Sequence, residues 1–181
     1  MRVIVLFKEG YEEIEALSTV DVLRRAGVSC DMVGMDEEYV KSSRNILIKM
    51  DKVFDESDKN ADVVVLPGGL PGATSLRDDT RVIELVRKLY NENKIVAAIC
   101  AAPIVLEKAG ILKGKNFTCY PGFEKEAVSG NYQDVLMCVD DNIVTARGPA
   151  ASLAFAYAVL EKCGIDSTSY QNAMQYPYLT K

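Results

Sequence analysis

Cys100 is the residue of this sequence best placed to act as a nucleophile. It follows the apolar run Ile95 to Ile99, and Pro103 comes shortly after it, at a position suited to the first turn of a helix. A thiol at such a strand-to-helix turn faces unpaired backbone N–H groups and the positive end of the helix dipole. We therefore expect Cys100 to have a lowered pKa and to react as a thiolate. The alternative is a small buried hydrophobic residue in an alanine-rich packing layer, the commonest fate of a free cysteine.

The chain contains no histidine, which excludes Ser-His-Asp triads, Cys-His dyads and histidine-ligated metal sites. Another group must carry protons, and Glu15 is the candidate. It shares a helix strip with Thr19 and Val22, where an unpaired carboxylate is costly. If Glu15 packs against the Cys100 sulfur, burial and the thiolate charge raise its pKa, so that it holds a proton and returns it during turnover.

A glycine-rich turn, residues 66–72, leaves a neighbouring strand, and its amides are suited to bind an oxyanion or sulfur oxygens. Its spacing matches neither nucleotide-binding glycine signature. Alone, such a turn is more often without a ligand, so a binding role for it is expected only because Cys100 lies beside it. Arg25, Arg44 and Arg147 could supply charge near a pocket, although lone arginines are usually surface residues in weak ion pairs.

Short apolar runs alternate along the chain with segments of helical periodicity. The runs are β-branched and nearly continuous, as in strands that are covered on both faces of a parallel sheet. This alternation predicts an α/β doubly wound sandwich with helices on both faces, whose sites form at the C-terminal ends of strands. Three such ends carry the candidate chemistry: Glu9 to Glu15, Pro67 to Gly72 and Cys100 to Pro103.

The expected strands are 3–7, 28–34, 62–66 and 94–99, followed by a hairpin of 135–139 and 143–145. The expected helices are 12–26, 80–91, 103–109 and 150–162. In the first helix, Ile14 and Leu17 are assigned to the apolar side. Glu12 and Glu13 are interpreted as solvated acids that complement the helix dipole.

The composition limits the class of protein. The 181 residues are 49% hydrophobic and 26% charged, which fits one globular domain, 1–181. The net charge of −5 gives no reason to bind nucleic acid or an anionic membrane. Five cysteines form no CxxC pair, and we find no signal peptide or membrane span. We therefore expect a cytoplasmic protein with reduced thiols.

Five segments together carry a resemblance to a known family: Gly10 to Glu15, Val20 to Gly27, Val64 to Gly69, Ala97 to Pro103 and Thr145 to Pro149. With them the sequence resembles the ThiJ/PfpI superfamily, and within it the branch of the parkinsonism-associated protein deglycase and its bacterial relatives. The resemblance runs nearly end to end.

The resemblance implies a flavodoxin-like sandwich, a single ThiJ/PfpI-type (class I glutamine amidotransferase-like) domain, a homodimer and no cofactor. It implies that Cys100 is the nucleophile and that a protonated Glu15 is hydrogen-bonded to it. The amides of Gly69 and Ala101, with Gly68 beside them, match the oxyanion donors. The positions that match the pocket or a dimer contact are Arg25, Arg44, Tyr120, Arg147, Gly148 and Pro149.

Two residues depart from the family pattern. Ala101 stands where the protease-like branch has a histidine, so peptidase activity is not expected. Tyr120 stands where some members have a pocket histidine, and a phenol is a poor base near pH 7. Cys119 is either a resolving thiol or, as is commoner, a buried structural cysteine. Lys49 matches the position of another member's oxidisable peripheral cysteine.

The resemblance and the pairing of Cys100 with Glu15 lead to one principal hypothesis. We expect glutathione-independent conversion of α-oxoaldehydes such as methylglyoxal and glyoxal to hydroxy acids, or removal of their early adducts from proteins. The expected partners are thus small aldehydes or glycated proteins. Two alternatives remain: an oxidative-stress sensor that acts through oxidation of Cys100, and a non-catalytic binding or chaperone-like domain.

Overall fold

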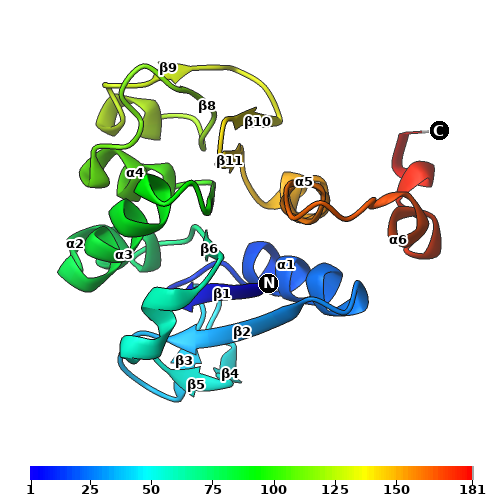
Figure 1. Ribbon diagram of the computed structural model, residues 1–181, viewed down its shortest axis with the longest axis horizontal. Helices are drawn as coiled ribbons and strands as arrows, with labels where there is room; N and C mark the ends of the chain where they lie inside the picture. Colours follow the sequence, from blue (N-terminus) through cyan, green and yellow to red (C-terminus); the bar gives the residue numbers. More distant parts are fainter. Residues whose placement is uncertain (181) are drawn as a thin grey trace.

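A seven-stranded sheet forms the centre of the protein, for which a computed structural model describes residues 1–180 (Figure 1). The strand order is β10-β11-β7-β6-β1-β2-β5. All neighbours in this sheet are parallel except β10 and β11, which form an antiparallel hairpin. The strands are β1 (Arg2–Phe7), β2 (Ser29–Gly34), β5 (Lys52–Val53), β6 (Val63–Leu66), β7 (Ile95–Ile99), β10 (Met137–Asp140) and β11 (Ile143–Ala146).

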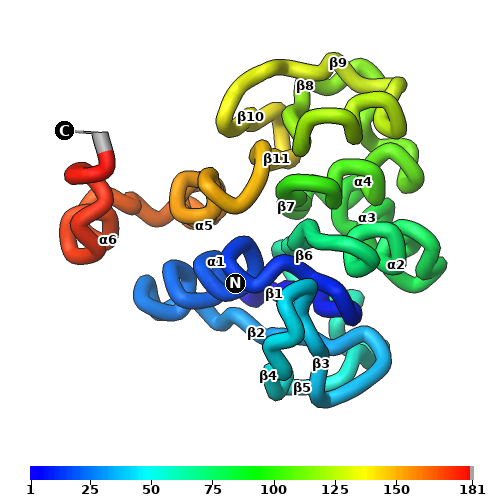
Figure 2. The backbone as a smooth tube through the Cα atoms, turned by 180° about the vertical axis from the view of Figure 1, so that it is seen from behind, coloured from blue at the N-terminus to red at the C-terminus, as the bar shows by residue number. Residues whose placement is uncertain are grey.

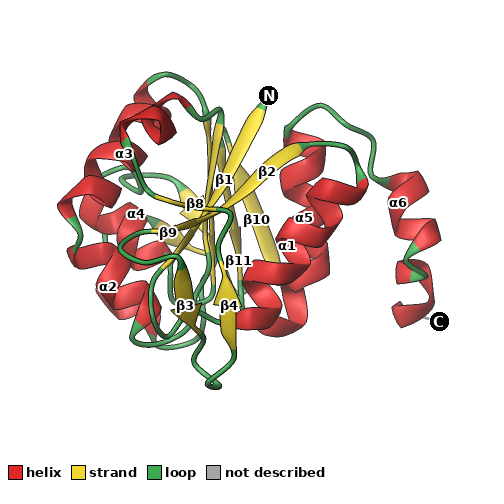
Figure 3. Ribbon diagram, turned by 90° about the horizontal axis from the view of Figure 1, so that it is seen from below, coloured by secondary structure: helices red, strands yellow, loops and turns green. Residues whose placement is uncertain are grey.

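Helices cover both faces of this sheet, which confirms the predicted α/β sandwich. On one face lie α1 (Glu13–Arg25) and α5 (Ser152–Lys162), which pack on each other. On the other lie α2 (Gly72–Asp78), α3 (Thr80–Asn91) and α4 (Pro103–Ala109) (Figure 3). Short 3-10 helices occupy four connections: η1 (Glu56–Asn60), η2 (Phe123–Glu126), η3 (Pro149–Ala151) and η4 (Tyr176–Thr180).

The alternation of side chains along β1 produces two separate cores. Val3, Val5 and Phe7 pack in the cluster that includes α1 and α5, whereas Ile4 and Leu6 pack in the cluster that includes α3 and α4. Successive side chains of a strand point to opposite faces, so a strand buried on both sides must be apolar throughout. This requirement is why the central strands appear in the sequence as continuous apolar runs.

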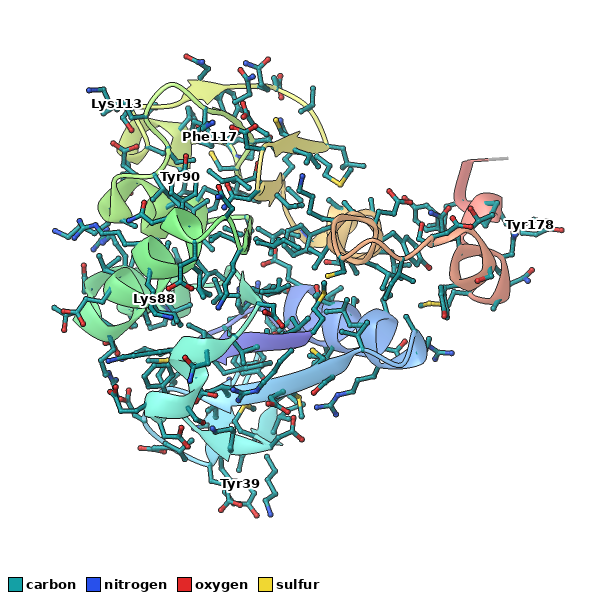
Figure 4. All side chains as sticks on the ribbon, viewed as in Figure 1. Tyr39, Lys88, Tyr90, Lys113, Phe117 and Tyr178 are labelled. Atoms are coloured by element: carbon teal, nitrogen blue, oxygen red, sulfur yellow. The ribbon has the colours of Figure 1, made fainter. Side chains whose placement is uncertain are left out.

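Two small sheets, strand β5, helix α2 and a helix near the C-terminus were not predicted from the sequence. The hairpin of β3 (Tyr39–Lys41) and β4 (Leu47–Lys49) extends from the C-terminal end of the main sheet, and β8 (Asn116–Phe117) pairs with β9 (Asn131–Tyr132). Helix α6 (Thr168–Ala173) lies beyond α5, set apart from the body (Figure 2). Figure 4 shows Tyr39 at the lower outer edge of the molecule and Tyr178 at the right-hand edge, in agreement with their exposed side chains.

The first helix corrects one sequence assignment. Ile14 is 54% exposed, although it was assigned to the apolar side. The buried strip of α1 instead contains Glu15, Ala16, Thr19 and Val22, and Ile14 projects from the opposite side. The remaining helix boundaries agree to within two residues, including Thr80–Asn91 and Pro103–Ala109. Among residues 1–180, no helix has the length and apolar character needed to cross a bilayer.

Candidate active site

Three turns meet at one edge of the sheet, as the sequence predicted. Strands β7, β6 and β1 are neighbours, so the turns that follow them are adjacent. The Gly68 carbonyl accepts a hydrogen bond of 2.9 Å from Glu12 N–H, and this bond joins the β6 turn to the β1 turn. Ser43 N–H donates to the Tyr11 carbonyl at 2.8 Å, which holds the β3–β4 turn against the same edge.

Cys100 stands directly after β7 in a strained conformation. Its φ of 63° lies in the left-handed region, which is uncommon for a residue with a side chain. Hydrogen bonds to two other segments hold this geometry. Cys100 N–H donates to the Ala146 carbonyl at 2.9 Å, and the Cys100 carbonyl accepts from Tyr120 N–H at 2.8 Å. The sharp turn therefore presents the sulfur at the edge of the sheet, with the residue 9% exposed.

Glu15 lies entirely inside the protein, one turn into α1. Its Oε2 accepts the Gly68 N–H at 2.8 Å, and the carboxyl group lies close enough to Cys100 for each group to shift the pKa of the other. The other carboxyl oxygen, Oε1, has no hydrogen-bond partner among the described residues. A buried carboxyl oxygen without a donor is a suitable position for a proton.

Burial raises the pKa of Glu15 from 4.5 to about 7. The Gly68 N–H and the contact with Cys100 oppose this shift, and the nearby charge of Glu12 adds to it. A carboxyl group with such a pKa exchanges its proton readily near neutral pH. The predicted role of Glu15 as a proton carrier therefore has a physical basis in its burial.

The pKa of Cys100 contradicts the sequence prediction, because it is raised well above its ordinary value. Burial is the largest cause, and the charge and hydrogen bonding of Glu15 act in the same direction, against the N–H groups of Ala101 and Gly69. The effect of Glu15 on the pKa of Cys100 depends on whether Glu15 is charged. A protonated Glu15 has no charge and donates to a thiolate, so it then favours the thiolate. The Cys100–Glu15 pair is therefore more stable with one proton than with none.

Two glycines make this close arrangement possible. A Cβ atom on Gly68 would lie 2.6 Å from Cys100 Cβ and 2.7 Å from Glu15 Oε2. Gly69 has a φ of 88°, and a Cβ there would lie 2.5 Å from the Glu12 nitrogen. Any larger residue at either position would separate the turns that hold the cysteine and the carboxyl group.

A hollow of about 400 Å³, here called the Cys100 hollow, opens above the sulfur. Among the predicted site residues, Cys100, Gly69, Ala101, Arg44, Tyr120 and Pro149 line it, and Glu12, Ser43, Leu70 and Phe123 complete the lining. The exposed Arg44 guanidinium donates to the Ser43 carbonyl at 3.3 Å and has no carboxylate within 4 Å in the described chain. The hollow thus has a free positive charge on one side.

The structure does not bring every predicted residue to the Cys100 hollow. Arg25 is exposed on α1 and forms an ion pair with Asp21, outside the lining. Arg147 and Gly148 line a neighbouring hollow instead. Cys119 is fully buried, and burial raises the pKa of its thiol to about 12, which agrees with the structural interpretation.

Glu12 is a functional residue whose role the sequence interpretation missed. It was interpreted as a solvated acid, but its side chain caps α1 by accepting Glu15 N–H at 2.8 Å, and it lines the Cys100 hollow. An acid three residues before Glu15 is a capping pattern that could have revealed this. Ser43, Leu70 and Phe123 had no such signal, because they come from turns. No group of three or more metal-ligating residues occurs within residues 1–180.

The sequence matches the model of the DJ-1/PfpI family over residues 1–162. Protein dj-1beta of Drosophila melanogaster is 39% identical over 165 residues, covering 88% of this chain and 87% of the relative. The glutathione-independent glyoxalase DJR-1.2 of Caenorhabditis elegans is 32% identical over 161 residues, covering 87% and 86%. Protein DJ-1 homolog B of Arabidopsis thaliana is 36% identical over 164 residues, covering 89% of this chain but only 37% of that longer protein.

The crystal structure of a cysteine-to-alanine mutant of the DJ-1 superfamily protein STM1931 from Salmonella typhimurium has the same fold. It superposes with a TM-score of 0.88 at 29% identity and covers 97% of each chain.

Replacing Gly68 by alanine should destabilise the protein by about 2–3 kcal/mol, because the new methyl group has no space between Cys100 and Glu15. Urea unfolding of the purified variant measures the loss. Gly148→Ala is the matched control, since its methyl group would meet only the Tyr120 ring, at 3.3 Å. Equal stability losses in the two variants would contradict the crowding at Gly68.

The burial of Glu15 predicts a pH-dependent difference in stability between the wild type and Glu15→Gln. Between pH 4.5 and 7 the unfolded chain releases this proton and the folded chain keeps it, so wild-type stability falls relative to the variant as pH rises. One pKa unit corresponds to about 1.36 kcal/mol, so the rise of the Glu15 pKa from 4.5 to about 7 changes the stability difference by about 3 kcal/mol in total. Denaturant unfolding at pH 5 and pH 8 tests this, and a pH-independent difference would exclude a raised Glu15 pKa.

Proposed function

The chain belongs to the DJ-1/PfpI family, and from that premise we propose that it is a cysteine-dependent, glutathione-independent glyoxalase. Its substrates are small α-oxoaldehydes such as methylglyoxal and glyoxal, or their early adducts on proteins. One observation carries the proposal: the Cys100 sulfur lies between a proton-holding carboxyl group and two backbone N–H groups, at the base of a hollow of about 400 Å³.

The reaction begins with a proton transfer inside the pair. In the pair that holds one proton, the Cys100 thiol passes this proton to the Glu15 carboxylate, which leaves a thiolate beside a neutral carboxyl group. The thiolate attacks the aldehyde carbon of R–CO–CHO and forms a hemithioacetal alkoxide. The N–H groups of Gly69 and Ala101 face the sulfur and are placed to stabilise this oxyanion.

The next step moves hydrogen from the aldehyde carbon to the ketone carbon. Glu15 gives its proton to the alkoxide and, as the resulting carboxylate, moves the proton of the former aldehyde carbon to the neighbouring carbon through an enediol. The aldehyde carbon is thereby oxidised to a thioester and the ketone carbon is reduced to an alcohol. Water then cleaves the thioester, which releases R–CHOH–COOH and regenerates the Cys100 thiol, so no external oxidant or cofactor is consumed.

Arg44 gives the hollow a preferred polarity. Its guanidinium has no acidic partner within the described residues, and it lines the same hollow as Cys100, in which the product acquires a carboxylate. A positive charge at that side favours the oxygen-rich end of the substrate and the developing acid. Tyr120, which also lines the hollow, supplies a phenol that can donate a hydrogen bond.

A second candidate function is sensing of peroxide through Cys100. The same two N–H groups are placed to donate to the oxygens of a sulfinate, and a protonated Glu15 would donate to it as well. Two molecules of hydrogen peroxide would oxidise the thiolate through the sulfenate to the sulfinate and release two molecules of water. In this alternative the protein acts through partners and has no aldehyde turnover.

We also propose that the protein is a cytoplasmic homodimer. The five cysteines are free thiols, which is compatible with a reducing compartment. Ile14 is a large exposed apolar side chain on α1, of the kind that a subunit contact covers, and Arg25 lies on the same helix. Sedimentation velocity at micromolar concentration should give twice the monomer mass of 19.9 kDa. A sedimenting species of monomer mass would contradict the dimer.

The glyoxalase proposal predicts that wild-type protein consumes methylglyoxal and forms lactate without glutathione. Cys100→Ala should show only the background rate, and Glu15→Gln should lose at least about 100-fold in kcat, since an amide cannot exchange the proton. Cys138→Ala is the matched control, because Cys138 is half-buried on β10 and does not line the Cys100 hollow. Its rate should equal that of the wild type.

The same purified proteins distinguish the glyoxalase from the peroxide sensor. Absence of lactate formation by the wild type, together with conversion of Cys100 to sulfinate by low concentrations of peroxide, would replace the glyoxalase proposal by the sensor. Mass spectrometry of peptides containing Cys100 and Cys138 detects the modification and its selectivity.

A further inference from the structure

We propose that the Cys100 hollow continues into an apolar subsite that binds the R group of R–CO–CHO, so that the protein prefers α-oxoaldehydes with a branched or cyclic alkyl group over methylglyoxal. The inference rests on the proposed glyoxalase function and deepens it. The subsite is a second hollow of about 240 Å³, here called the Leu136 hollow, which is lined by Tyr120, Pro121, Leu136, Arg147, Gly148, Pro149, Ala150 and Ala151.

The two hollows are neighbours that share a wall. Tyr120 and Pro149 line both of them. Gly148 lies against the Tyr120 ring, and a Cβ atom there would be 3.3 Å from it. Tyr120 N–H also bonds to the Cys100 carbonyl at 2.8 Å, so the shared wall is fixed relative to the nucleophile. The Leu136 hollow is therefore the adjacent space for the substituent of a substrate that is bound at the sulfur.

The chemistry of the walls selects an apolar occupant. Leu136 is 51% exposed and Ala150 is also exposed, and both present only carbon atoms from their side chains. The one charged lining residue is Arg147, and its charge is already paired with a carboxylate. Its guanidinium pairs with Asp134 and donates to the Tyr132 hydroxyl at 3.3 Å.

The Arg44 side of the Cys100 hollow has the opposite character. Arg44 has a guanidinium without a carboxylate partner within the described chain. A substrate with an oxygen-rich end and an apolar end is thus oriented by the two walls, with its carbonyl groups toward Arg44 and R toward Leu136.

The size of the Leu136 hollow sets the size of R. One water molecule occupies about 30 Å³ of liquid, and carbon groups are of similar size, so the hollow has space for about six to eight non-hydrogen atoms. The methyl group of methylglyoxal would leave most of this space empty. An isobutyl or cyclohexyl group would fill it and bury apolar surface, and this burial raises kcat/KM.

The experiment measures kcat/KM without glutathione for alkyl glyoxals with R = methyl, isobutyl and cyclohexyl, whose carbonyl groups are electronically similar. We expect kcat/KM to rise about tenfold from methyl to cyclohexyl. Ala150→Phe fills the Leu136 hollow and should lower the cyclohexyl value about tenfold while it leaves the methyl value within twofold. The matched control, Ala173→Phe, places the same side chain on the exposed and distant helix α6 and should leave both values unchanged.

A second variant protects the test against misfolding of the first. Leu136→Asn keeps the size of the wall but makes it polar, and it should reduce the cyclohexyl preference several-fold without changing methylglyoxal turnover. If the wild type consumes all three aldehydes at equal kcat/KM, or if Ala150→Phe lowers the methyl and cyclohexyl values alike, the subsite is wrong and the glyoxalase function stands.

Two further outcomes would also overturn the subsite. If the wild type consumes no aldehyde, the proposed function fails and the subsite fails with it. If Ala150→Phe changes the mass of the protein in sedimentation and the wild type shows no alkyl preference, the Leu136 hollow is a contact between copies of the chain.

Discussion

A buried carboxyl group and a buried thiol share one small space, and the arrangement around them follows from that constraint. The Glu15 side chain has no exposure to solvent and Cys100 has almost none, so neither charge is stabilised by water. The pair avoids the cost of two buried negative charges by keeping a proton between its members. Gly68 holds Glu15 in place through its N–H, and its missing side chain leaves the space in which the carboxyl group and the thiol meet.

The sheet order is what allows such a pair to form from distant parts of the chain. Glu15 comes from the helix after β1, and Cys100 from the turn after β7, with the Gly68 turn between them. Parallel strands place all three turns at one edge, whereas an antiparallel neighbour would send one of them to the opposite edge. A hydrogen bond from Cys100 N–H to the Ala146 carbonyl and another from Tyr120 N–H to the Cys100 carbonyl then fix the strained turn at Cys100. Two other segments of the chain thus hold the backbone of the nucleophile.

The central elements were predictable from the sequence because their burial is complete. Strands covered on both faces must be apolar at every position, and the buried face of α3 has the helical period, with Val82, Ile83, Leu85, Val86 and Leu89. The β3–β4 hairpin was missed because its strands are only three residues long and mostly exposed, so no period is visible. The pKa of Cys100 was predicted in the wrong direction, since the sequence indicated the helix start but not the depth of burial.

Without histidine, the proton chemistry of this pocket depends on the exclusion of water. Burial is the largest cause of the raised Glu15 pKa, so solvent entering the Cys100 hollow would return that pKa toward its ordinary value and leave a carboxylate beside the sulfur. A charged Glu15 disfavours the thiolate. The packing that buries Glu15 beneath the Gly68 turn therefore maintains the protonated carboxyl group. A substrate that fills the hollow displaces the remaining water, which strengthens the raised pKa of Glu15 and favours the thiolate when the aldehyde is in position to react.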